Sequence, residues 1–248
     1  MRLRVQVWRQ SGGTGAWEFH EVAGLEPAMS VLDLLDRLNR TLVERGSPAI
    51  AFESDCREGI CGACGLTVDG RAQGPERNTP VCHQRLWSFR DGQTVRVEPL
   101  RAGAFPVLKD LVVDRGALDD LVRVGGYVDI QTGSAPDAEA LPVGHEAAEE
   151  ALDFAACIGC GACVAACPNG SANLFLGAKL RSLALLPLPS LERSRRARAM
   201  TREADELFGP CSLYGECARV CPAGIPLAAV AVVNAERTRA AWSRWGRP

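Results

Sequence analysis

The residues with the strongest chemical signal in this sequence are its eleven cysteines, which fall into three groups. No cysteine lies between residues 82 and 157, which indicates two separate metal-binding modules. An odd number of cysteines cannot all pair as disulfides within one chain. The first residues alternate apolar and polar side chains without a secretory signal, which favours a cytosolic metalloprotein over a secreted disulfide scaffold.

The first group, Cys56, Cys61, Cys64 and Cys82, begins with the spacing C-x4-C-x2-C. This is the arrangement of a plant-type [2Fe–2S] centre, in which four thiolates hold two irons. Three glycines in the loop would let backbone N–H groups approach the sulfurs. A zinc site or buried free thiols are the alternatives, but zinc usually takes two paired C-x2-C knuckles. We interpret His83 as a packing or surface residue beside a complete ligand set.

The second group, Cys157, Cys160, Cys163 and Cys167, has the spacing C-x2-C-x2-C-x3-C-P. This is the bacterial ferredoxin run, whose fourth cysteine binds the other of two clusters. We expect a helix that starts near Pro168 to direct this fourth thiolate towards the neighbouring cluster.

The third group repeats this frame at Cys211, Cys217 and Cys221, but Tyr214 replaces the middle cysteine. Exchanging the last cysteine of each run predicts two ligand sets. The three-thiolate set matches a [3Fe–4S] cluster, a cubane that lacks one iron. The alternatives are a [4Fe–4S] cluster with water or another side chain on its fourth iron, or a phenolate ligand from Tyr214. The predicted sets are Cys157, Cys160, Cys163 and Cys221 for [4Fe–4S], and Cys167, Cys211 and Cys217 for [3Fe–4S].

The elements around the first group predict a small β-grasp sheet crossed by one helix. Alternating patterns indicate strands at 3–7 and 17–22, and further strands are expected at 66–68 and 94–97. Ser30 and Asp33 resemble a capping box before a helical stripe of leucines. Asp69-Gly70 is a hairpin turn signal.

The rest of the chain is predicted to be mainly helical. Residues 105–114 could start a helix, the Gly- and Pro-rich stretch 125–144 is typical of a connector, and the part from 146 onward is rich in helix formers. The predicted class is therefore α+β. We expect a plant-type [2Fe–2S] ferredoxin domain at 1–104, a connector at 105–145 and an all-α dicluster ferredoxin domain at 146–248.

Composition excludes several classes of function. The chain has 248 residues, 23% of them charged, with a net charge of −2, which disfavours a nucleic-acid partner. The uncharged stretch 154–178 contains four cysteines and four glycines, so we expect no transmembrane helix. No G-x-G-x-x-G fingerprint is present, so the chain is not expected to bind a dinucleotide itself.

With these motifs the chain resembles the iron–sulfur subunit of succinate dehydrogenase or fumarate reductase (respiratory complex II). The resemblance extends over nearly the whole chain, and rests on the cysteine loop at 56–64, the segment Phe-Pro-Val-Leu-Lys-Asp-Leu-Val-Val-Asp at 105–114, and both later cysteine runs. The cysteine that the family lacks falls at Tyr214, which supports [3Fe–4S].

The resemblance implies an electron-transfer subunit of a membrane-bound succinate:quinone oxidoreductase. Electrons would pass from FAD in a flavoprotein partner through [2Fe–2S], [4Fe–4S] and [3Fe–4S] to a quinone at membrane-anchor subunits. The chain would lie on the cytoplasmic face of the cell membrane, with no catalytic residue of its own. The alternatives are a fumarate reductase running in the opposite direction, an iron–sulfur subunit of another flavin-linked enzyme, and a soluble multicluster ferredoxin serving a flavoenzyme.

Departures from the family pattern bear on the quinone. Asn169 to Ala172 replace an aromatic segment after Pro168, and Ser212 stands where ubiquinone-type members have a histidine. These differences favour menaquinone, or an anchor that is built differently. Pro168 and Ser212 are the positions at which a quinone contact is expected.

Two charged segments remain. Five arginines between residues 193 and 202 predict a solvated helix face, or a surface that docks an acidic partner. The tail from Arg237 to Trp242, with Trp245 to Arg247, suits a membrane interface or a frayed surface helix.

Overall fold

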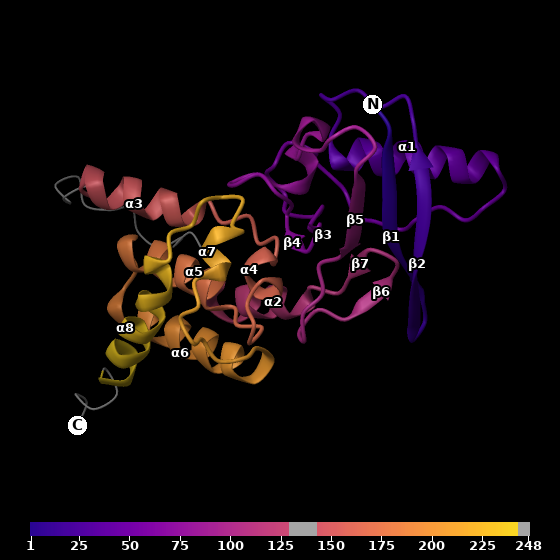
Figure 1. Ribbon diagram of the computed structural model, residues 1–248. Coiled ribbons are helices and arrows are strands. Elements are labelled where there is room, and N and C mark those ends of the chain that lie inside the picture. The colour runs from indigo at the N-terminus through magenta and orange to yellow at the C-terminus, as the bar shows by residue number, and fades with distance from the viewer. Residues whose placement is uncertain (129–142, 243–248) are drawn as a thin grey trace.

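The computed structural model describes residues 1–128 and 143–242, which form two halves that lie side by side. A sheet with one long helix makes up the N-terminal half, and a group of helices makes up the C-terminal half (Figure 1). The predicted α+β class is confirmed. Residues 129–142 of the expected connector, and the tail residues Trp245 to Arg247, lie outside the described residues.

The N-terminal half is built on a seven-stranded mixed sheet. Its strands run in the order β4-β3-β5-β1-β6-β7, with β2 paired to β1. The β1–β5 pair is parallel, and the other pairs are antiparallel. Leu3, Val5 and Val7 alternate with more exposed residues and enter the core, as period-two patterning requires. The strands are β1 (Leu3–Ser11), β2 (Thr14–Val22), β3 (Leu66–Val68), β4 (Arg71–Ala72), β5 (Thr94–Pro99), β6 (Val107–Lys109) and β7 (Val112–Val113).

Helix α1 (Val31–Glu44) packs its leucine stripe against this sheet. The Ser30 side chain accepts from Asp33 N at 3.2 Å, and the Asp33 carboxylate accepts from Ser30 N at 2.8 Å, so the predicted capping box is confirmed. Asp69 and Gly70 form the predicted hairpin turn with φ of 50° and 74°. Two short 3-10 helices follow, η1 (Val81–His83) and η2 (Leu86–Ser88).

The prediction that a helix starts within 105–114 is wrong, because this segment forms the β6–β7 hairpin. Its turn residue Asp110 has φ of 47° and is buried. The Asp110 carboxylate accepts from Gln10 N at 3.0 Å and from Ala51 N at 2.9 Å. These contacts with two distant segments hold the hairpin at the sheet edge, which local pattern could not reveal.

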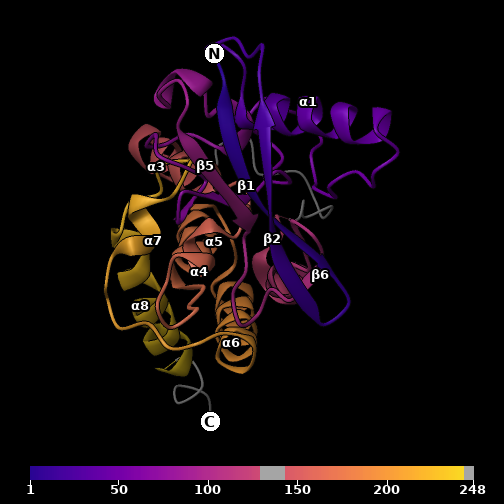
Figure 2. The ribbon, with the colours of Figure 1, turned by 45° about the vertical axis from the view of Figure 1, so that its right-hand side comes forward.

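The C-terminal half packs its helices around buried apolar clusters (Figure 2). Helix α5 begins at Asn173, five residues beyond Pro168, so the expected helix start near Pro168 is wrong. No helix among the described residues is long and apolar enough to cross a membrane. The helices are α2 (Gly116–Leu121), the π-helical turn η3 (Val122–Gly126), α3 (His145–Ala155), α4 (Ala162–Ala165), α5 (Asn173–Leu185), α6 (Ser190–Leu207), α7 (Glu216–Arg219) and α8 (Ala228–Trp242).

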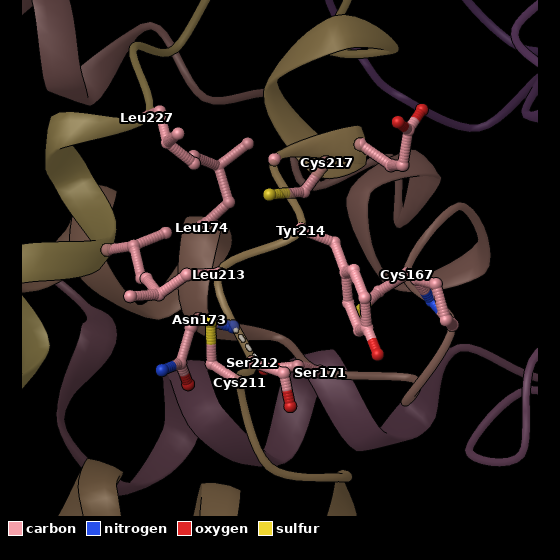
Figure 3. Close-up of a pocket in the computed structure, with 14 residues that line it drawn as sticks. Cys167, Ser171, Asn173, Leu174, Cys211, Ser212, Leu213, Tyr214, Cys217 and Leu227 are labelled. Carbon is pink, nitrogen blue, oxygen red and sulfur yellow. Dashed lines mark hydrogen bonds between the residues drawn. The ribbon is translucent and has the colours of Figure 1, made fainter.

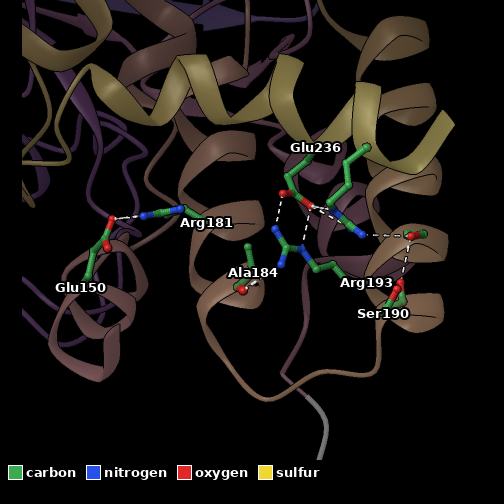
Figure 4. A network of polar contacts seen from close by, with 8 residues as sticks. Glu150, Arg181, Ala184, Ser190, Arg193 and Glu236 are labelled. Atoms are coloured by element: carbon green, nitrogen blue, oxygen red, sulfur yellow. Dashed lines mark hydrogen bonds and ion pairs between the residues drawn. The ribbon is translucent and has the colours of Figure 1, made fainter. Parts of the chain in front are cut away.

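The arginine run on α6 does not form one solvated face. Arg195 and Arg202 are exposed, as expected, but Arg196 is buried and stacks 4.1 Å from the centre of the Tyr127 ring. The Arg193 Nε donates to the buried Glu236 carboxylate at 2.9 Å, which ties α6 to α8 (Figure 4). The pattern of charge alone did not show that α8 supplies a buried carboxylate.

A junction of small and apolar residues joins the two halves. Ala72 and Leu100 from the sheet half pack with Cys160 and Ala162 from the helical half. Arg115 spans the same boundary: it donates to Gly62 O at 2.6 Å, Ala63 O at 3.1 Å and Glu53 Oε2 at 3.0 Å, and approaches Cys160 O at 3.4 Å. The guanidinium therefore fixes the two cysteine loops relative to one another.

Helices α5 and α8 cross at Gly177, where their backbones nearly touch. A Cβ at Gly177 would lie 2.0 Å from Ala229 O, far inside van der Waals contact. Only glycine allows this approach, which packs α8 against α5, the helix whose Leu174 lies beside the cysteines of both later runs.

We predict that Gly177→Ala lowers the stability of the cluster-loaded chain by about 1–3 kcal/mol, because the helices must separate. This loss exceeds the gain in helix propensity, which is about 1 kcal/mol. Thermal unfolding followed by circular dichroism measures the change. Gly103→Ala is the control, since a Cβ there has nothing within 4 Å. Equal unfolding midpoints for the two variants would contradict the prediction.

Candidate iron–sulfur sites

The first cysteine group lies on the loop between α1 and β3, together with η1. Positive φ angles at Arg57, Gly59 and Gly62 curl the loop, as the glycine pattern predicted. Backbone N–H groups of Glu58 and Cys61 donate to the Cys56 sulfur at 3.3 and 3.4 Å. The loop thus presents donors to a sulfur in the way that cluster loops do.

The loop shifts the pKa of its thiols in opposite directions. Backbone hydrogen bonds, led by the one from Glu58, lower the pKa of the Cys56 thiol to about 7. Burial is the largest cause that raises the pKa of Cys64 to about 12, and the nearby Cys82 and Cys61 add to it. The thiols of Cys61, Cys64 and Cys82 therefore lie close enough to repel one another as anions. The half-buried His83 packs towards Gly59.

A second pocket contains all four cysteines of the predicted [4Fe–4S] set: Cys157, Cys160, Cys163 and Cys221. Leu174, Phe175 and Ile225 add apolar walls. Burial raises the pKa of Cys160 to about 12 and that of Cys163 well above its ordinary value. Such thiols remain protonated in an apolar pocket unless a cation compensates the thiolate charge, and iron supplies that compensation.

A third pocket contains Cys167, Cys211 and Cys217 (Figure 3). Tyr214 projects from the same loop as Cys211 and lines this pocket, but its side chain is largely exposed. No fourth cysteine is among the described residues that line the pocket. Pro168 and Ser212, the two expected quinone contacts, both line it as well.

The exchange of cysteines between the two runs is visible in these pockets. Cys221 shares its pocket with the run at 157–163, and Cys167 shares its pocket with the run at 211–217. Electrostatic repulsion follows the same grouping. Cys221 and Cys157 help to raise the pKa of Cys160, whereas Cys167 and Cys211 help to raise the pKa of Cys217. Four cysteines therefore line one pocket and three line the other, and their assignment to particular clusters stays a prediction.

Residues other than the cysteines hold the two C-terminal cysteine runs together. Asn169 donates through Nδ2 to Ser212 Oγ at 2.8 Å and to Pro210 O at 2.9 Å. A Cβ at Gly209 would lie 1.7 Å from Asn169 O, so this close approach requires glycine. The sequence did not reveal the contacts of Asn169, Gly209 and Arg115, because each acts through a partner far away in the chain.

The chemistry of the donor sets fits iron–sulfur clusters. Soft thiolates are their usual protein ligands, and sets of four and three match the types predicted. Among the described residues, no group of three or more His, Cys, Asp or Glu side chains is placed to hold a single metal ion.

Two family models match the chain. A 2Fe-2S iron-sulfur cluster binding domain matches residues 3–120, and a 4Fe-4S dicluster domain matches residues 156–225. These matches confirm that the chain contains a [2Fe–2S]-binding domain and a [4Fe–4S] dicluster domain, as predicted.

Curated relatives and a solved structure resemble the chain over most of its length. The succinate dehydrogenase iron-sulfur subunit of Bacillus subtilis is 28% identical over 84% of this chain and 81% of that protein. The fumarate reductase iron-sulfur subunit of Wolinella succinogenes is 30% identical over 81% of each. A chain of the Mycobacterium smegmatis Sdh1 complex in the apo form shares the fold, with a TM-score of 0.75 at 23% identity, covering 98% of this chain and 97% of that one. The chain therefore belongs to the family of iron–sulfur subunits of succinate dehydrogenase and fumarate reductase.

Proposed function

We propose that this chain is the electron-transfer subunit of a membrane-bound succinate:quinone oxidoreductase. It takes electrons from FAD in a flavoprotein subunit and passes them to a quinone, menaquinone in our proposal, at membrane-anchor subunits. When bound, the clusters supply one-electron carriers with different potentials. Its place is the cytoplasmic face of the cell membrane, reached through the anchor. We also propose that residues 105–145 connect a plant-type [2Fe–2S] domain at 1–104 to a dicluster domain at 146–248.

The observation that carries this proposal is the crossed arrangement of the C-terminal cysteines. Separate pockets with four and three thiols support a [4Fe–4S] cluster on Cys157, Cys160, Cys163 and Cys221, and a [3Fe–4S] cluster on Cys167, Cys211 and Cys217. The loop with Cys56, Cys61, Cys64 and Cys82 is proposed to hold [2Fe–2S]. Curled backbone, donated N–H groups and apolar walls are what the chain itself contributes.

Exposed apolar side chains lie beside the first and the last of the three proposed cluster sites. Ile60 on the first loop is 66% exposed, which suits contact with the flavoprotein subunit. Leu213 and Tyr214 are 69% and 61% exposed beside the third pocket. We propose that this second patch contacts the anchor, and that Pro168 and Ser212 lie next to the quinone.

Purification of the native chain from membranes tests the function. We expect it to co-purify with a subunit that contains FAD, and the clusters of the complex to be reduced by succinate. Recovery of the chain alone in the soluble fraction, with no flavoprotein attached, would favour the soluble ferredoxin instead.

Single alanine variants test the crossed ligand sets. We expect Cys221→Ala to remove the [4Fe–4S] signal, although Cys221 belongs to the last cysteine run. Cys167→Ala should remove the [3Fe–4S] signal, although Cys167 belongs to the earlier run. Electron paramagnetic resonance (EPR) with iron counting distinguishes these losses. The reverse pattern, with each variant losing the cluster of its own run, would refute the exchange.

Replacement of Tyr214 tests the number of ligands at the third site. We expect Tyr214→Cys to convert this site towards [4Fe–4S], so that the EPR signal of the oxidised [3Fe–4S] cluster disappears. Tyr214→Phe is the matched control, and should keep that signal because no phenolate ligand is required. Loss of the signal in Tyr214→Phe would instead assign a ligand role to the tyrosine oxygen.

A further inference from the structure

A buried glutamine of the sheet half lies between two of the cysteine sites. Gln73 directly follows β4 and is 2% exposed. Its backbone has φ of 69°, a left-handed conformation that non-glycine residues adopt rarely. The backbone N–H of Gln73 donates to Leu66 O at 2.8 Å, which holds the residue at the end of the β3–β4 hairpin.

The two ends of the Gln73 amide have different surroundings. Oε1 accepts a hydrogen bond of 3.0 Å from Val81 N, the residue before Cys82 of the first site. Nε2 is buried and has no hydrogen-bond partner of normal geometry among the described residues. A buried amide N–H without an acceptor is unfavourable, so its placement calls for an explanation.

Gln73 Nε2 lies at the junction between the two halves, beside Cys160 of the second site. A Cβ built on Gly65 would lie 3.5 Å from Gln73 Nε2 and 3.2 Å from Cys160 O, so both atoms border the same small space. The neighbouring Ala72 packs in one apolar cluster with Cys160. The Gln73 amide also lies close enough to the Cys160 thiol to interact with it, although the two form no hydrogen bond of normal geometry in the described residues.

An N–H donor beside a cluster ligand has a known physical effect. Reduction adds one electron to the cluster and increases the negative charge on its sulfurs, with no bond made or broken in the protein. A hydrogen bond to a ligand sulfur stabilises the reduced form more than the oxidised form, which raises the reduction potential. In an apolar junction this preference is stronger than in water.

We propose that Gln73 of the sheet half donates a hydrogen bond through Nε2 to the sulfur of Cys160, and that it sets the reduction potential of the [4Fe–4S] cluster there. Gln73 is a positioning residue that acts through Cys160. Because Oε1 anchors the amide on the Cys82 segment, the first domain adjusts the cluster of the second. This inference rests on the proposed function, which assigns the [4Fe–4S] cluster to that pocket.

Gln73→Met in the full-length, cluster-loaded chain keeps a side chain of similar size but removes the amide, both the Nε2 donor and the Oε1 acceptor of Val81 N. We expect an EPR-monitored redox titration to show the [4Fe–4S] midpoint at a more negative potential. At the potential that half-reduces the wild-type cluster, the ratio of reduced to oxidised cluster should fall about tenfold, as for one hydrogen bond to a charged group. The potential of the [3Fe–4S] cluster, which lies away from Gln73, should stay near its wild-type value.

Gln73→Glu is the second variant, because its carboxyl group can still accept from Val81 N. We expect the [4Fe–4S] midpoint to move in the same negative direction above the pKa of the introduced acid. Gln93→Met is the control. Gln93 directly precedes β5, where its side chain accepts from Arg90 N and donates to Asp69, and it makes no contact with a cysteine in these hydrogen bonds. It should leave all three potentials unchanged.

A spectroscopic readout is independent of the potential. With ¹⁵N in the glutamine side-chain amides, pulsed EPR of the reduced [4Fe–4S] cluster should show a nitrogen coupling that Gln73→Met abolishes. An unchanged [4Fe–4S] midpoint together with an unchanged coupling in Gln73→Met would overturn the inference. Absence of a [4Fe–4S] cluster from the wild-type chain would instead overturn the proposed function.

Discussion

Burial of the cysteine thiols is the constraint on which the helical half depends. Desolvation is the largest influence on Cys160, Cys163, Cys217 and Cys221, and it raises the pKa of each. A thiolate can persist in such surroundings only beside a strong positive charge. The apolar walls that make these pockets suitable for iron therefore make them unsuitable for bare sulfur, so the free energy of cluster binding contributes to the folding of this half.

The junction between the halves shows how closely two cysteine loops can be brought together. A Cβ at Gly62 would lie 2.3 Å from Ile158 O, so the loop of the first site rests directly on the backbone of the second. Arg115 satisfies the carbonyl groups that this approach would otherwise leave without donors. Short separation and fixed orientation between neighbouring sites are what an electron-transfer chain requires of its protein.

The cysteine groups, the capping box at Ser30 and the turn at Asp69-Gly70 could be predicted from sequence, because each is set by short spacing and local geometry. The β6–β7 hairpin could not, because Asp110 takes its hydrogen bonds from Gln10 and Ala51. Charge counting also failed on α6, where the buried Glu236 on α8 pairs with Arg193. In both cases the deciding partner lies far away in the chain, where periodicity carries no information.

The crossed cysteine sets have a consequence for chain entropy. A cluster on Cys157 and Cys221 would close a loop of about 60 residues, and one on Cys167 and Cys211 would close a loop of about 40 residues inside it. With these proposed ligand sets, each cluster would constrain the unfolded chain much as a disulfide does, and the two closed loops would be nested. With the outer loop closed, the ends of the inner loop are already confined. Binding of one cluster would therefore reduce the entropy lost on binding the other, and the helical half would gain both in a cooperative step.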